Sequence, residues 1–202
     1  MLRWIRRRIE RMRARIRWIR TPEHLKRQAS VHEAGHALAA WVLPTFGEIQ
    51  RVTVLPEGDF RGYTLATHAL AVPPELGQIV DLMTMGMAGA AAENLILGSC
   101  DLGSVDDLIR TYAWWLVHSY GMPVASALGV SAGLVVDMIS SDPQRRVNAH
   151  LVLTPPLAFA AAKAMRLLRT RRGDLLKIAN ALRRRRTLGH RDLERILGPR
   201  PA

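Results

Sequence analysis

The chain has 202 residues, 49% hydrophobic and 23% charged, a composition that excludes a collagen-like fibre, a disulfide-stabilised miniprotein and a fully disordered chain. Its single cysteine, Cys100, excludes an internal disulfide. The net charge of +12 is unevenly spread: residues 1–20 hold nine Arg and one Glu, residues 163–202 hold thirteen Lys or Arg and three acids, and residues 21–162 have a net charge of −6. We infer a neutral-to-acidic body with basic ends, which disfavours a body that binds nucleic acid.

Residues 1–20 are predicted to form a basic amphipathic helix. Arginines fill most of the segment, and Trp4 and Trp18 lie off the apolar stripe, where we expect interfacial anchors or exposed side chains. The stripe repeats every three or four residues, at Leu2, Ile5, Ile9, Met12, Ile16 and Ile19. An anionic membrane surface ranks first as its partner, further copies of the chain second and nucleic acid third. Repulsion between arginines counts against a close bundle of copies.

The remaining residues, 21–202, are predicted to form one mainly α-helical domain with a small β-hairpin or sheet. Thr21 as N-cap and Pro22 at the first helical position begin a helix that should end at Leu43. Alternating β-branched residues predict two strands, and periodic apolar residues bounded by glycine or proline predict further helices. The strands are expected at 50–56 and 61–66, and the helices at 75–97, 105–120, 156–172, 173–186 and 190–197. With no run of 18 uncharged apolar residues, we expect no transmembrane helix.

The helix expected at 22–43 contains an H-E-x-x-H motif at residues 32–36. Residues four apart lie on one helix face, so His32 and His36 can both reach one Zn²⁺. Glu33 lies about 100° round the helix and is placed to act as general base toward a zinc-bound water. The alternative is a helix that carries two solvated or core histidines. The apolar flanks argue against that alternative, because burying unpaired His and Glu is costly.

A catalytic zinc needs a third protein ligand beside the two histidines. By chemistry alone, four carboxylates remain candidates for this position: Glu93, Asp101, Asp106 and Asp107.

Four sequence blocks, in order, resemble the zinc peptidase domain of FtsH-type AAA proteases. They read VHEAGHALAAWVLP, RVTVLPEGDFRGYT, MAGAAAENLILG and GSVDDL, and the resemblance extends over about residues 22–198. It implies a helical zincin-type fold with the H-E-x-x-H motif on a buried helix. It also implies that Asp107, in the G-x-x-[ND]-D-L block, is the third zinc ligand, and that Glu93 orients a zinc-bound histidine. Asn94 stands where the family has a second Glu, a departure expected to weaken that support.

The same resemblance implies how substrate is held and how subunits assemble. An edge strand beside the metal resembles a surface that captures an extended polypeptide through backbone pairing. We place that strand at Arg51, Val52, Thr53, Val54 and Leu55, with an ordinary structural hairpin as the rival interpretation. Peptidase domains of the family form six-membered rings, which implies a homo-oligomer.

The sequence lacks a G-x-x-x-x-G-K-[ST] P-loop, whereas FtsH-type proteases carry an ATPase module. We therefore expect a zinc-dependent endopeptidase without an ATPase of its own, which cleaves unfolded or loosely folded proteins or works with an unfoldase in trans. The expected location is cytoplasmic, or peripheral at the membrane. The rival hypotheses are a weakly active or inactive adaptor built on the peptidase fold, and a basic membrane-surface or nucleic-acid-binding protein with structural histidines.

Overall fold

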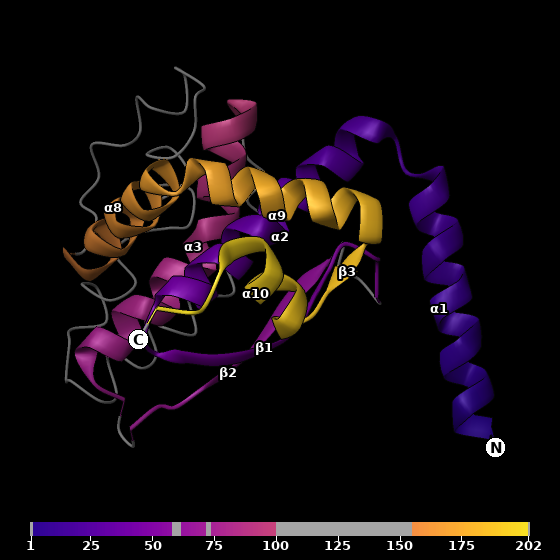
Figure 1. Cartoon of the computed structure of the whole chain (residues 1–202), viewed down its shortest axis with the longest axis horizontal. Helices are drawn as coiled ribbons and strands as arrows, with labels where there is room; N and C mark the ends of the chain where they lie inside the picture. Colours follow the sequence, from indigo (N-terminus) through magenta and orange to yellow (C-terminus); the bar gives the residue numbers. More distant parts are fainter. Residues whose placement is uncertain (1, 58–61, 72–73, 100–154, 202) are drawn as a thin grey trace.

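The computed structural model describes residues 2–57, 62–71, 74–99 and 155–201. The described part is mainly helical with one small three-stranded antiparallel sheet, as expected from the sequence (Figure 1). Its elements are α1 (Leu2–Arg20), α2 (Glu23–Val42), β1 (Phe46–Thr53), β2 (Tyr63–His68), α3 (Leu76–Leu97), α8 (Pro155–Thr170), α9 (Arg172–Arg185), β3 (Thr187–Leu188) and α10 (His190–Leu197). The helix expected at 105–120 lies outside the described residues.

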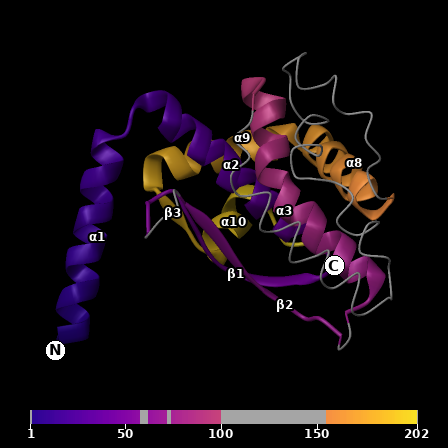
Figure 2. The same ribbon diagram turned by 180° about the vertical axis from the view of Figure 1, so that it is seen from behind.

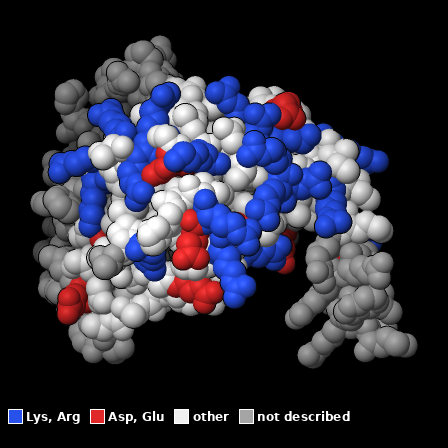
Figure 3. All heavy atoms as spheres, in the orientation of Figure 1, with Lys and Arg blue, Asp and Glu red and all other residues white. Residues whose placement is uncertain are grey.

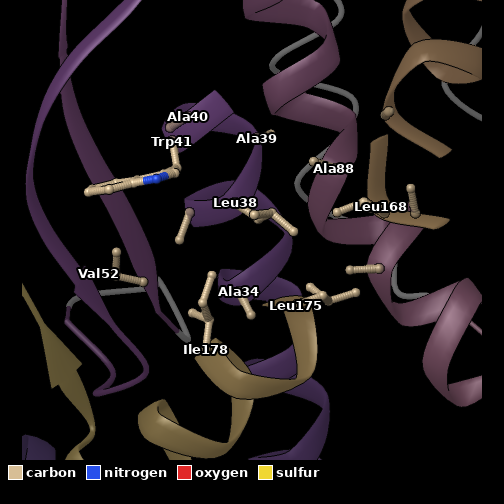
Figure 4. Close-up of a cluster of buried hydrophobic side chains, with 14 of the residues drawn as sticks. Ala34, Leu38, Ala39, Ala40, Trp41, Val52, Ala88, Leu168, Leu175 and Ile178 are labelled. Atoms are coloured by element: carbon tan, nitrogen blue, oxygen red, sulfur yellow. The ribbon is translucent and has the colours of Figure 1, made fainter. Parts of the chain in front are cut away.

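Helix α2, which carries the H-E-x-x-H motif, lies at the centre of the fold. It packs against α3, α9 and β1, and its buried residues include Leu38 and Trp41 (Figure 4). The contact with α3 is close because both helices present small residues. A Cβ at Gly35 would lie 2.2 Å from the carbonyl oxygen of Ala88 and 2.7 Å from the Cβ of Ala92. The glycine inside the motif therefore lets the α3 backbone approach the histidines.

The sheet has the strand order β2-β1-β3, so β1 is its central strand. Val52 pairs with Thr64 on one side and with Leu188 on the other, and the amide of Val54 donates to the carbonyl oxygen of Arg186 at 3.0 Å. The backbone of residues 52–54 is thus already engaged with β3, and the segment Arg51–Leu55 is not the sheet edge that we expected. The sequence interpretation missed this because β3 is only two residues long.

Several element boundaries differ from the sequence expectations. Strand β1 begins at Phe46, earlier than expected, and α2 begins at Glu23 without a side-chain N-cap bond. Instead of capping α2, the Thr21 hydroxyl donates to the carbonyl oxygen of Arg17 at 2.9 Å and so closes the end of α1. By contrast, α3 ends at Leu97, as expected, and Gly98 after it caps the helix with a left-handed backbone at φ 76°.

Helix α3 is apolar along most of its length. Residues 77–97 are long and apolar enough to cross a membrane, but 78% of the most apolar window is buried inside the fold, as in the core helix of a globular domain. Its buried Asp81 accepts hydrogen bonds from Thr45 Oγ1 at 2.8 Å and from Lys163 Nζ at 2.5 Å. This ion pair joins α3 to α8.

The C-terminal segment closes the far end of α2. The guanidinium of Arg200 donates to five backbone carbonyl oxygens, those of Ala40, Trp41, Leu43, Phe46 and Gly47. The last carbonyls of a helix have no partners within the helix, so a cation with several donors suits this position. Arg200 therefore fixes the end of α2 and the start of β1.

Candidate metal centre

The two histidines of the motif meet on one face of α2. Their Nε2 atoms lie 3.0 Å apart, and their rings meet edge to face with centroids separated by 4.7 Å. His36 is buried, with 8% of its surface exposed. Two imidazole nitrogens bound tetrahedrally to one zinc at about 2.0–2.1 Å lie roughly 3.3 Å apart. The observed pair is therefore close to the geometry of two ligands of one metal ion.

The other ring nitrogen of each histidine points to a hydrogen-bond acceptor. His36 Nδ1 lies 2.7 Å from the carbonyl oxygen of Met85, and His32 Nδ1 lies 2.7 Å from Glu93 Oε1. A carbonyl oxygen and an ionised carboxylate can only accept hydrogen bonds. With these partners, the proton of each neutral histidine ring is assigned to Nδ1. In the neutral rings, both Nε2 atoms then present lone pairs to each other.

Two lone pairs at 3.0 Å repel unless a positive charge lies between them. Burial and, after it, positive charge on the neighbouring His32 lower the pKa of His36 to about 3 against the opposing effect of the Met85 hydrogen bond, so His36 itself resists taking up a proton. A metal cation satisfies both nitrogens without protonating either one. The donor set therefore fits Zn²⁺, for which neutral imidazole is a preferred ligand.

Helix α3 leaves room for such an ion at Gly89. A Cβ built at this residue would lie 2.5 Å from His32 Nε2 and 2.5 Å from His36 Nε2. A glycine thus stands where a side chain would enter the space equidistant from the two ligand atoms. The sequence block MAGAAAEN contained this signal, but nothing in the sequence alone assigned Gly89 to the metal.

Glu33 lies beside this space on α2 and is buried, with 5% of its surface exposed. Its Oε2 accepts a hydrogen bond from the hydroxyl of Thr64 on β2 at 3.0 Å. Burial raises the pKa of Glu33 to about 7, while positive charge on His32 and the Thr64 hydroxyl oppose that rise. A carboxyl group with a pKa near neutrality is suited to accepting and returning a proton. Thr64 was missed by the sequence interpretation, because the contact depends on how β2 crosses α2.

Glu93 on α3 is buried and engages the outer nitrogen of His32, on the opposite side of the ring from His36. Its second oxygen, Oε2, accepts a hydrogen bond at 3.2 Å from Gln28, which lies one turn before His32 on α2. Of the four carboxylates considered as third ligand, Glu93 is thus placed to orient a histidine. The other three, Asp101, Asp106 and Asp107, lie outside the described residues. Within the described ranges, no group of three His, Cys, Asp or Glu converges on one point.

Comparison with known proteins places the chain in a family. The sequence pattern of Peptidase family M41 matches residues 20–196, which include α2, α3 and the C-terminal helices. The chain belongs to peptidase family M41. This membership agrees with the resemblance found in the sequence blocks.

Relatives of this M41 chain carry names of proteases, and the two bacterial ones below are named as zinc metalloproteases. It is 32% identical to ATP-dependent zinc metalloprotease FtsH 3 of Symbiobacterium thermophilum over 89% of this chain and 31% of the relative. It is 31% identical to FtsH 2 of Sphaerobacter thermophilus, over 89% of this chain and 28% of the relative. It is 27% identical to a mitochondrial inner membrane m-AAA protease component of Mus musculus, over 87% of this chain and 23% of the relative. The M41 chain thus spans less than a third of the length of these relatives.

Proposed function

We propose that this M41 chain is a zinc-dependent endopeptidase that hydrolyses peptide bonds of unfolded or loosely folded proteins. The observation that carries the proposal is the His32–His36 pair, whose Nε2 atoms lie 3.0 Å apart while both Nδ1 atoms face acceptors. Membership of family M41 and the zinc metalloprotease names of the relatives support it.

In this proposal, His32 and His36 hold zinc through Nε2, and Asp107 completes the ligand set. When bound, zinc supplies a Lewis acid that polarises the scissile carbonyl and lowers the pKa of water. The Met85 carbonyl and Glu93 hold the two rings in the tautomer that presents both Nε2 lone pairs.

Glu33 is the general base of the proposed reaction. Its carboxylate takes a proton from the attacking water and delivers it to the amine nitrogen that leaves. The Thr64 hydroxyl donates a hydrogen bond to Glu33 Oε2 at 3.0 Å. Glu33 Oε1 is therefore the oxygen that exchanges protons in this proposal. The surrounding burial keeps bulk water from competing for that carboxylate.

The sheet topology moves the proposed substrate strand from Arg51–Leu55 to β2. Among the described residues, β2 pairs with β1 alone, and its Thr64 contacts the proposed base. An extended polypeptide that pairs with the outer edge of β2 would lie beside the metal centre and be held without strong sequence preference.

Assembly and substrate delivery are further parts of the proposal. By resemblance to FtsH-type proteases, we propose a homo-oligomeric ring of six copies and a cytoplasmic or peripheral membrane location. The 202 residues contain no P-loop, so these residues alone would not unfold stable substrates, and unfolding would depend on an ATPase module outside them.

A metal and activity assay tests the central claim. The purified protein is assayed for zinc per chain and for cleavage of casein without ATP, beside Glu33→Gln and the exposed control Glu48→Gln. We expect one zinc per chain and cleavage that is lost only in Glu33→Gln. Zinc without cleavage would favour the adaptor hypothesis, and the absence of zinc would refute the metal centre.

Asp107 is tested against its neighbour in the sequence. Asp107→Asn should lose zinc, since an amide is a weaker ligand than a carboxylate, whereas Asp106→Asn should retain it. The reverse result would assign the third ligand to Asp106.

A further inference from the structure

Helix α1 extends away from the rest of the fold and joins it at one end (Figures 1 and 2). At that end Trp18 is 5% exposed and belongs to the hydrophobic core cluster. The Lys26 ammonium lies 6.0 Å from the centre of the Trp18 ring, and it donates to the carbonyl oxygen of Ile19 at 3.4 Å. Trp18 is therefore a core residue that attaches α1 to α2, which corrects the expectation of an interfacial or exposed tryptophan.

Attachment through Trp18 leaves another face of α1 open. Met12, Ile16 and Ile19 are 58%, 42% and 65% exposed. Among the described residues, Leu65 is the other large hydrophobic side chain exposed to this degree. The three α1 residues are spaced by four and three positions, so they share one helix face. Leu2, Ile5 and Ile9 continue the same spacing in the sequence.

Basic side chains border this open face. Arg13, Arg15, Arg17 and Arg20 are exposed on α1, and the described part of the helix has Glu10 as its only acid. Arg183 pairs with Glu23 at 2.6 Å, which places the Arg-rich end of α9 beside the start of α2. Figure 3 shows Lys and Arg gathered over this side of the molecule.

The exposed apolar face and the arginines that border it together discriminate between a second copy, nucleic acid and an anionic membrane as the partner of α1. A second copy would bring two arginine-rich helices together, which costs electrostatic energy. Nucleic acid would use the arginines but leave the exposed methionine and isoleucines in water. A bilayer rich in anionic lipid satisfies both features, because headgroups neutralise the arginines while the acyl boundary accepts the apolar face.

We propose that α1 is a peripheral docking helix for an anionic membrane surface, with Met12, Ile16 and Ile19 inserted at the acyl boundary. The Trp18 contact couples the docked helix to the domain that carries the metal centre. The proposal does not depend on catalysis, because it is tested by vesicle binding and not by peptide hydrolysis.

Vesicle co-sedimentation tests the proposal. The probes are phosphatidylcholine vesicles with and without 30% phosphatidylserine, and the variant is Ile16→Asn with Ile19→Asn. Leu65→Asn is the matched control, because it removes an exposed hydrophobic side chain outside α1. We expect binding that requires phosphatidylserine, weakens in 0.5 M salt, falls by about fivefold or more in the double variant and is unchanged in the control. Circular dichroism and thermal unfolding establish that the variants fold.

Three outcomes would overturn the proposal. Equal binding of wild type and the double variant would show that the apolar face does not insert. Wild-type binding that is undetectable on phosphatidylserine vesicles would exclude the membrane surface. Loss of self-association in the double variant, measured by light scattering, with unchanged vesicle binding would assign the face to a second copy.

Discussion

A methyl group at Gly89 provides the sharpest test of the metal centre. In Gly89→Ala, the new Cβ would lie 2.5 Å from both Nε2 atoms, whereas real Cβ atoms essentially never approach other atoms within 3.0 Å. Each imidazole would therefore have to retreat by at least ~0.5 Å, the tolerance within which a working site is held. We expect zinc affinity to fall by ~100-fold or more, equivalent to ~2.8 kcal/mol.

The fold should survive the same substitution. Alanine is favoured over glycine inside a helix by about 1 kcal/mol, which offsets part of the local strain in α3. The matched control is Gly77→Ala on the same helix, where an added Cβ meets nothing within 4 Å. The assay is competition for zinc against a chromophoric chelator, together with thermal unfolding of each metal-free protein. Wild-type zinc affinity in Gly89→Ala would refute the assignment of this space to the metal.

Three further substitutions test contacts around the centre. Thr64→Val should lower kcat by about tenfold with little change in KM, because Glu33 loses the hydroxyl that orients it. The control Thr67→Val, on the same strand, should leave kcat unchanged. Equal effects of the two substitutions on kcat would remove Thr64 from the mechanism. Arg200→Ala should lower the free energy of unfolding by ~3 kcal/mol in urea titrations, against less than ~0.5 kcal/mol for the exposed Arg195→Ala. Lys163→Met should lower the free energy of unfolding by ~3 kcal/mol, because the buried Asp81 loses its cationic partner and keeps only the Thr45 hydroxyl, and a neutral result would show that this ion pair does not stabilise the fold.

The sequence predicted the parts of the site that depend on local spacing. His32 and His36 meet because residues four apart share a helix face, a property of α2 alone. The helix α3 and its stop at Gly98 likewise followed from local signals. These features require no knowledge of how distant segments pack.

Contacts between distant segments could not be predicted in the same way. Strand β3, two residues long, lacks a periodic pattern, so the central position of β1 and the edge position of β2 were not visible in the sequence. The Thr64 hydroxyl reaches Glu33 only through the crossing of β2 over α2. The burial of Trp18 depends on how α1 joins α2, whereas its place off the apolar stripe had suggested exposure.

The Arg200 contacts have a consequence for synthesis on the ribosome. They join residues 153 to 160 positions apart, so the helix bearing the H-E-x-x-H motif is translated long before the side chain that caps it. Closing so long a loop is slow compared with forming a helix. Until Arg200 emerges, the last carbonyls of α2 lack this partner, and the end of the motif helix is free to fray. A nascent chain would therefore fix the end of its motif helix only after Arg200 has left the exit tunnel.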